Sequence, residues 1–166
     1  MGRPIKRAYE AAPVSVSKSR SSIDKILLKW GVAGVQWDDD YETGVAQLRF
    51  RWKRADDSML VARFRIEVDS EEALHEKAKD GRSGIFSEQK YARLKAERGK
   101  REHRALHNFL KSMFEAIEHG IIPAETLLLA WLEDVDGQTV HDKLASRLGI
   151  LSSIPLRKAL DEPGKD

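Results

Sequence analysis

The chain has 166 residues, of which 41% are hydrophobic and 34% are charged, so it is long enough for one domain with a sizeable core. It has no cysteine, which excludes disulfides and thiolate metal sites, and no apolar run reaches the roughly 18 residues of a membrane span. The net charge of +2 conceals a division, because residues 1–114 carry +7 and residues 115–166 carry −5. The basic part therefore has the potential to attract polyanions.

The N-terminal region is basic and lacks apolar periodicity. We expect residues 1–20 to form a flexible arm of charge +4, which is either solvated or in contact with nucleic acid. The arm has no apolar core of a secretory signal, so we expect a cytoplasmic protein. A helix follows, in which Ser21 and Asp24 match a capping box and Gly31 suits a left-handed C-terminal cap. Its predicted buried stripe comprises Ile23, Ile26, Leu27 and Trp30.

Three strands are predicted next, over residues 33–38, 44–53 and 58–68, and the short turns between them make an antiparallel meander. In the stretch QLRFRWK, which begins at residue 47, apolar and polar side chains alternate, so one face of the strand is apolar and the other cationic. The third strand repeats this pattern. The polar face of the sheet would therefore carry one acid, Glu67, against five cations: Arg49, Arg51, Lys53, Arg63 and Arg65.

The remainder of the chain is predicted to be helical, over residues 71–79, 87–119, 124–132 and 140–148. The long second helix has a weak point at Gly99 and a charged first half, whereas its second half carries an apolar stripe: Leu106, Phe109, Leu110, Met113, Phe114 and Ile117. We expect one α+β domain over residues 21–148, with a charged helical extension at about 87–104 and a loose tail at 149–166. Its sheet would have three strands, or four with one extra strand. The N-terminal helix and the long helix would cover one face, and short helices would follow.

Two clusters of metal-binding residue types have simpler explanations. Four acids gather in Asp38–Glu42, but turns favour aspartate and the spacing is not that of a calcium-binding loop. His103 and His107 are four residues apart, yet no third ligand is apparent, and we interpret both as surface histidines. The sequence also lacks a nucleophile motif and a glycine-rich phosphate loop. We therefore expect no metal, no cofactor and no enzymatic activity.

The cationic strand face is the strongest functional signal. Rows of arginine and lysine can neutralise several backbone phosphates at once, and single strands are commonly held by such a groove together with aromatic side chains. We predict a nucleic-acid interface that adds Trp37 and Tyr41, the aromatic residues nearest this face, to the five cations. The alternative is an ordinary solvated face of an antiparallel sheet.

Several short motifs resemble a group of small uncharacterised proteins of phages and other bacterial mobile elements. The matching stretches are Lys29-Trp30-Gly31, Phe50 and Phe64 in their strands, Glu115 to Ile121, and Asp136 to Val140, which together span about residues 20–145. The chain departs from the pattern at Val135, where the group has proline, and in a longer charged segment at 71–100. The resemblance implies an accessory protein acting around DNA, and it provides no established catalytic residues to carry over to this chain.

These observations leave three functions open. The first is a non-enzymatic nucleic-acid-binding protein, with single-stranded DNA favoured because no helix-turn-helix or zinc module is visible. The second is an assembly subunit, or a homo-oligomer, that docks other chains through the charged helix at 88–104. The third is a metal-dependent enzyme using the acids of Asp38–Glu42.

Overall fold

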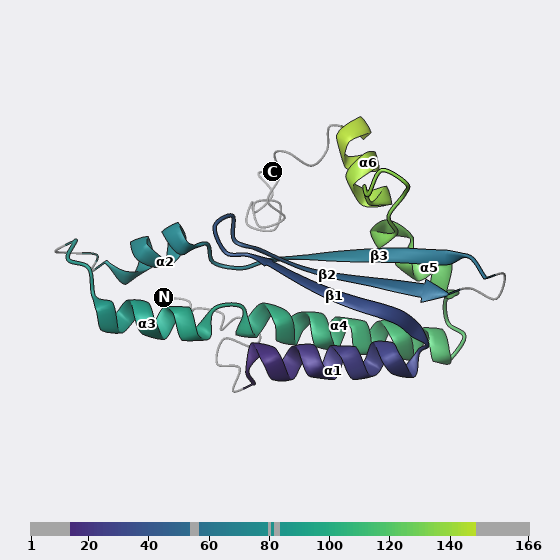
Figure 1. Cartoon of the computed structure of the whole chain (residues 1–166), viewed down its shortest axis with the longest axis horizontal. Coiled ribbons are helices and arrows are strands. Elements are labelled where there is room, and N and C mark those ends of the chain that lie inside the picture. The colour runs from purple at the N-terminus through teal and green to yellow at the C-terminus, as the bar shows by residue number, and fades with distance from the viewer. Residues whose placement is uncertain (1–13, 54–56, 80, 82–83, 149–166) are drawn as a thin grey trace, which may run out of the picture.

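The computed structural model describes residues 14–53, 57–79, 81 and 84–148, and it has the predicted α+β architecture (Figure 1). In chain order its elements are α1 (Val16–Lys29), β1 (Val32–Asp40), β2 (Val45–Lys53), β3 (Met59–Glu67), α2 (Glu71–Ala78), α3 (Glu88–Glu97), α4 (Lys100–Glu118), α5 (Ala124–Leu128), the 3-10 helix η1 (Leu129–Trp131) and α6 (Val140–Leu148). Helices α1 and α4 lie side by side along one face of the sheet, whereas α6 stands on the other side (Figure 1).

The first helix begins earlier than the sequence predicts. Ser15 is its N-cap, and the Ser15 hydroxyl accepts a hydrogen bond from the backbone N–H of Lys18 at 3.2 Å. The predicted arm is therefore wrong for residues 16–20, which are helical, while residues 1–13 lie outside the described part of the chain. Gly31 ends the helix in the left-handed conformation, with φ of +75°, as its sequence position indicates.

The sheet is an antiparallel meander in the order β1-β2-β3. Leu48 on β2 is opposite Trp37 on one side and Phe64 on the other, so one parity of every strand faces α1 and α4. The core lies between these layers, and the full burial of each large apolar side chain there contributes roughly 1.5–3 kcal/mol. It includes Ile23, Leu27, Leu48, Phe50, Phe64, Leu110, Met113 and Phe114.

The predicted long helix is divided at Gly99, which has φ of +72° and separates α3 from α4. Together α2 and α3 form a hairpin that extends beyond the sheet (Figure 1). A small aromatic cluster connects the two helices of the hairpin. The ring of His75 on α2 lies 4.5 Å from the ring of Tyr91 on α3 and 5.2 Å from that of Phe86. Every residue of α3 is at least partly exposed.

The C-terminal segment returns to the outer edge of β3. The helix predicted at 124–132 is shorter than expected, since α5 tightens into η1 and Leu132 is extended. Leu132 forms a β-bridge with Ala62, and the backbone N–H of Glu133 donates to the carbonyl of Val61 at 2.8 Å. The last helix, α6, has the predicted bounds. No helix among the described residues is long and apolar enough to cross a membrane.

Candidate nucleic-acid interface

The alternation in β2 and β3 places the five predicted cations on the sheet face that α1 and α4 leave uncovered, which we call the open face. Arg49 is opposite Arg63 across the two strands, and Arg65 is opposite Gln47. Arg51 and Arg65 are exposed, while the side chain of Arg49 is 48% exposed. The predicted polarity of the two strand faces is therefore confirmed.

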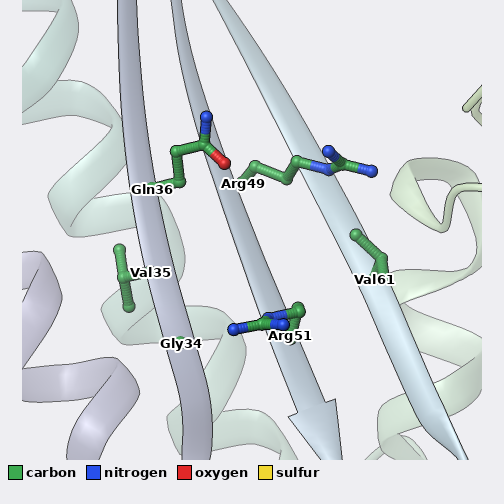
Figure 2. Close-up of a pocket in the computed structure, with 6 residues that line it drawn as sticks. All are labelled: Gly34, Val35, Gln36, Arg49, Arg51 and Val61. Atoms are coloured by element: carbon green, nitrogen blue, oxygen red, sulfur yellow. The ribbon is translucent and has the colours of Figure 1, made fainter.

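A shallow hollow of about 500 Å³ lies on the open face, lined by Gly34, Val35, Gln36, Arg49, Arg51 and Val61 (Figure 2). The two arginines in it diverge. Arg51 turns toward β1, where its guanidinium lies against Gly34, and Arg49 reaches across β3 (Figure 2). The hollow is thus bordered by two guanidinium groups and by the amide of Gln36, which are groups that bind phosphate oxygens.

Two of the five cations have acidic partners that come from the C-terminal segment of the chain. Arg49 donates to Glu133 through Nε at 2.7 Å and lies 2.5 Å from it through Nη2. Arg63 lies 3.4 Å from Glu133 and 2.8 Å from Asp142. The sequence did not indicate these contacts, because the acids lie 84 and 79 residues further along the chain.

The other three cations form no ion pair, or only an exposed one, with the described residues. Neither Arg51 nor Arg65 forms an ion pair with any described residue. Lys53 pairs with Asp57 at 2.7 Å, but both side chains are exposed, and such pairs contribute little stability. Three cations of the open face are therefore available to a ligand: Arg51, Arg65 and Lys53. Arg49, at the rim of the hollow, is paired with Glu133, but about half of its side chain is still exposed.

The open face is less strongly cationic than the two strands suggest. The register places Asp38 and Asp40 of β1 on the same face as Gln47 and Val45. Asp40 turns into the following loop, where it accepts from the backbone N–H groups of Glu42 and Thr43. The prediction of a single acid was wrong because it considered β2 and β3 without their neighbour.

Trp37 lies on the opposite face of the sheet, so its predicted place in the interface is wrong. Its indole Nε1 donates to Asp24 at 3.1 Å, and its ring lies 4.6 Å from the guanidinium of Arg20. Trp37 shares the parity of Val35, and the alternation of these two residues with Gln36 and Asp38 carries the signal for this placement.

Tyr41 belongs to a different hollow, of about 390 Å³, at the root of the α2–α3 hairpin. The guanidinium of Arg98 lies 4.7 Å from the Tyr41 ring and forms an ion pair with Glu71. Glu71 also accepts from Tyr91 at 2.5 Å and from Lys95 at 3.1 Å. The hydrogen bond from Tyr91, then those from Arg98 and Lys95, lower the pKa of Glu71 to about 2. Tyr41 is therefore part of the contact that anchors the hairpin.

A polar network near the joint of α3 and α4 corrects the expectation for His103. His103, expected on the surface, is only 2% exposed. Its Nδ1 lies 2.7 Å from the carbonyl of Gly99 and its Nε2 lies 2.9 Å from Arg20, which also holds Asp39 at 2.9 Å. Burial lowers the pKa of His103, and the hydrogen bond from Arg20 lowers that of Asp39. The spacing of His103 with Leu106 and Leu110 was the overlooked signal, because it continues the apolar stripe.

The acids of Asp38–Glu42 diverge rather than converge. Asp38 is on the open face, Asp39 pairs with Arg20 on the helix face, and Asp40 caps its own turn. No group of three or more acidic or histidine side chains within the described ranges is arranged to hold a metal ion. The acidic run has the geometry of a strand end and turn.

Comparisons of the chain with models of protein families, with curated proteins and with solved structures find no match.

Proposed function

We propose that the open sheet face binds the phosphate backbone of a nucleic acid. The observation that carries this proposal is the state of Arg51 and Arg65, two exposed guanidinium groups that have no ion-pair partner among the described residues. Guanidinium groups bind phosphate oxygens through paired, charge-assisted hydrogen bonds, and neutralising phosphates releases condensed counterions. Lys53 and the exposed part of Arg49 extend the same surface.

Single-stranded DNA is the ligand that we expect first. A single strand adapts its flexible backbone to a sheet surface, whereas reading a duplex requires an element that enters a groove. Among the described residues, the open face carries no aromatic side chain for base stacking, because Trp37 and Tyr41 lie elsewhere. We therefore expect binding that is mainly electrostatic, dependent on salt and largely independent of sequence.

The test is the binding of labelled single strands and duplexes, measured by fluorescence anisotropy between about 50 and 200 mM salt. Replacing Arg51 and Arg65 with Gln removes two open-face charges. We expect weaker binding and a salt slope that is flatter by about 0.7 for each phosphate of a single strand that the variant no longer neutralises. Replacing Lys18 and Lys25 with Gln removes the same charge from exposed positions on α1 and is the matched control. Equal binding by the two double variants would exclude the open face.

A second function, assembly with other chains, is favoured by the projection of α2 and α3 beyond the sheet (Figure 1). Ala92 and Ala96 are exposed, lie on one side of α3 and leave room for a facing helix. If α3 mediates self-association, replacing both with Glu reduces the mass measured by light scattering after size exclusion. Ala105→Glu, at an exposed position on α4, is the control, and a mass unaffected by either change would exclude self-association through α3.

A further inference from the structure

Glu133 is an unusual occupant of the open face, because its carboxylate is enclosed by arginines. Its side chain is only 3% exposed, and both of its oxygens are used, one by Arg49 and the other by Arg63. Figure 2 shows Arg49 extended across β3 toward the edge where the C-terminal segment returns. Two guanidinium groups around one pair of oxygens is also how a protein holds a phosphate.

Asp142 adds a second carboxylate from α6. It lies 2.8 Å from Arg63 and is half exposed, so Arg63 is held by two acids from two different parts of the segment. The backbone N–H of Thr139 donates to this carboxyl group at 3.3 Å, and the backbone N–H of Asp142 donates to the Thr139 hydroxyl at 3.1 Å. Burial has the largest single effect and would raise the pKa of Asp142, but the hydrogen bonds of Thr139 and His141 and the charge of Arg63 together keep the pKa below its usual value. The acid is therefore charged at neutral pH.

We propose that residues 132–142 form an intrachain competitor for the open face. In the free protein Glu133 and Asp142 occupy Arg49 and Arg63, and a bound nucleic acid replaces these carboxylates with its own phosphates. The inference rests on the proposed function, since it requires that the open face binds a polyanion. It assigns a role to the acidic character of the C-terminal part, whose charge of −5 over residues 115–166 opposes that of the basic part.

Asp142 and Glu133 differ in how readily a phosphate would displace them from the arginines. Asp142 is on α6, which contacts the body mainly through η1, and its half-exposed ion pair is screened by solvent. Glu133 is fixed more firmly, because its backbone bonds to Val61 and its neighbour Leu132 bridges to Ala62. A phosphate would therefore displace Asp142 first and compete with Glu133 only at higher affinity. This order makes Asp142 the more informative single change.

The test is the dissociation constant of a labelled oligothymidine for the full chain and for Asp142→Asn, Glu133→Gln and the double variant, at one salt concentration. We expect Asp142→Asn to bind about two- to fivefold more tightly, as an exposed ion pair is released, and the double variant about tenfold or more. Glu118→Gln is the matched control, because it removes one half-exposed, ion-paired negative charge from α4, the helix that covers the opposite face of the sheet. A double variant that binds no more tightly than Glu118→Gln overturns the inference.

Hydrogen exchange of the unmodified protein gives a second measurement, which decides the matter even if Glu133→Gln does not fold. We expect the backbone amides of residues 133–143 to exchange faster when oligothymidine is bound, and those of β2 to exchange more slowly. Unchanged exchange at residues 133–143 in a complex that depends on Arg51 and Arg65 overturns the competitor alone. No binding by any form of the protein, including the double variant, overturns both proposals.

Discussion

Gly34 and Arg51 are partners across β1 and β2, and the guanidinium of Arg51 occupies the space that a side chain at position 34 would take. A Cβ built on Gly34 would lie 2.9 Å from Nη2 and 3.3 Å from Nε of Arg51. Glycine within a strand is ordinarily unfavourable, and it often marks a place where another group approaches the backbone closely. Here the approaching group is one of the two arginines that are available to a ligand.

The first prediction concerns this contact. Gly34→Ala would push the Arg51 guanidinium off β1 without removing its charge, since the end of a flexible side chain can move. We expect stability to change by less than about 1 kcal/mol, because alanine suits a strand no worse than glycine does. Nucleic-acid binding, measured by anisotropy, is expected to weaken with little change in salt slope. Gly81→Ala, where a Cβ meets nothing within 4 Å, is the control. Unaltered affinity would show that the placement of Arg51 is immaterial.

The second prediction separates Trp37 from the interface. Trp37→Ala removes the bond to Asp24 and the ring beside Arg20, and we expect a loss of about 3 kcal/mol, near the low end for a large aromatic truncated to alanine. Trp37→Phe keeps a ring and loses the hydrogen bond, at a cost of about 1 kcal/mol. Urea unfolding of the two variants and of the unmodified protein measures both changes in the free energy of unfolding. The folded Trp37→Phe variant is expected to bind nucleic acid with the affinity of the unmodified protein. A marked loss of affinity would show that Trp37 does contribute to the binding surface.

The third prediction is a dependence of stability on pH through His103. Its pKa is lowered chiefly by burial, with Arg20 of α1 also opposing the charged form. The hydrogen bond to the Gly99 carbonyl and the charges of Asp39 on β1 and Glu102 on α4 favour that form but do not outweigh the burial. The unfolded chain takes up a proton near pH 6.5 but the folded chain does not, so the free energy of unfolding falls as the pH drops below about 6.5. The slope contributed by this one group is at most about 1.4 kcal/mol per pH unit.

Urea unfolding at pH 7, 6 and 5 measures this slope. We expect His103→Gln to be less stable at pH 7 and to have a flatter profile, because the buried titrating group is gone. His119→Gln, at an exposed position after α4, is the matched control and is expected to keep the slope of the unmodified protein. The lowered pKa of Asp39 acts only in more acidic solution, below its unfolded value of about 4. A His103→Gln profile as steep as the original would contradict the assignment.

The fourth prediction concerns the anchor of the α2–α3 hairpin. Glu71→Gln removes the charge that Arg98 and Lys95 share and weakens the bond from Tyr91. We expect the backbone amides of α2 and α3 to exchange faster with solvent while those of β2 and α4 are unchanged, since local openings need not involve the core. Glu72→Gln, at the adjacent exposed position, is the control. Faster exchange throughout the chain would show instead that the hairpin is part of the cooperative core.

The periodicity of apolar residues predicted the order of the elements and the inner face of each strand. Side chains alternate on a strand and recur every three or four residues on a helix, so the period of apolar residues identifies the buried side without reference to the rest of the chain. Leu48 and Phe50 are buried and Arg51 is exposed, as that period predicts. The left-handed conformation of Gly31 followed from local chemistry in the same way.

Which polar groups are available to a ligand depends on contacts between elements that are distant in the sequence. The partners of Arg49 and Arg63 arrive from the C-terminal segment, and the period of β2 carries no information about a carboxylate 84 residues away. The net charge of the open face likewise depends on the register between β1 and β2, which places Asp38 on this face. His103 is buried because Arg20 and the carbonyl of Gly99 satisfy both of its nitrogens, which depends on how α1 packs against α4. Burial patterns are local in sequence, whereas the pairing of charges is set by elements that meet only after the chain has folded.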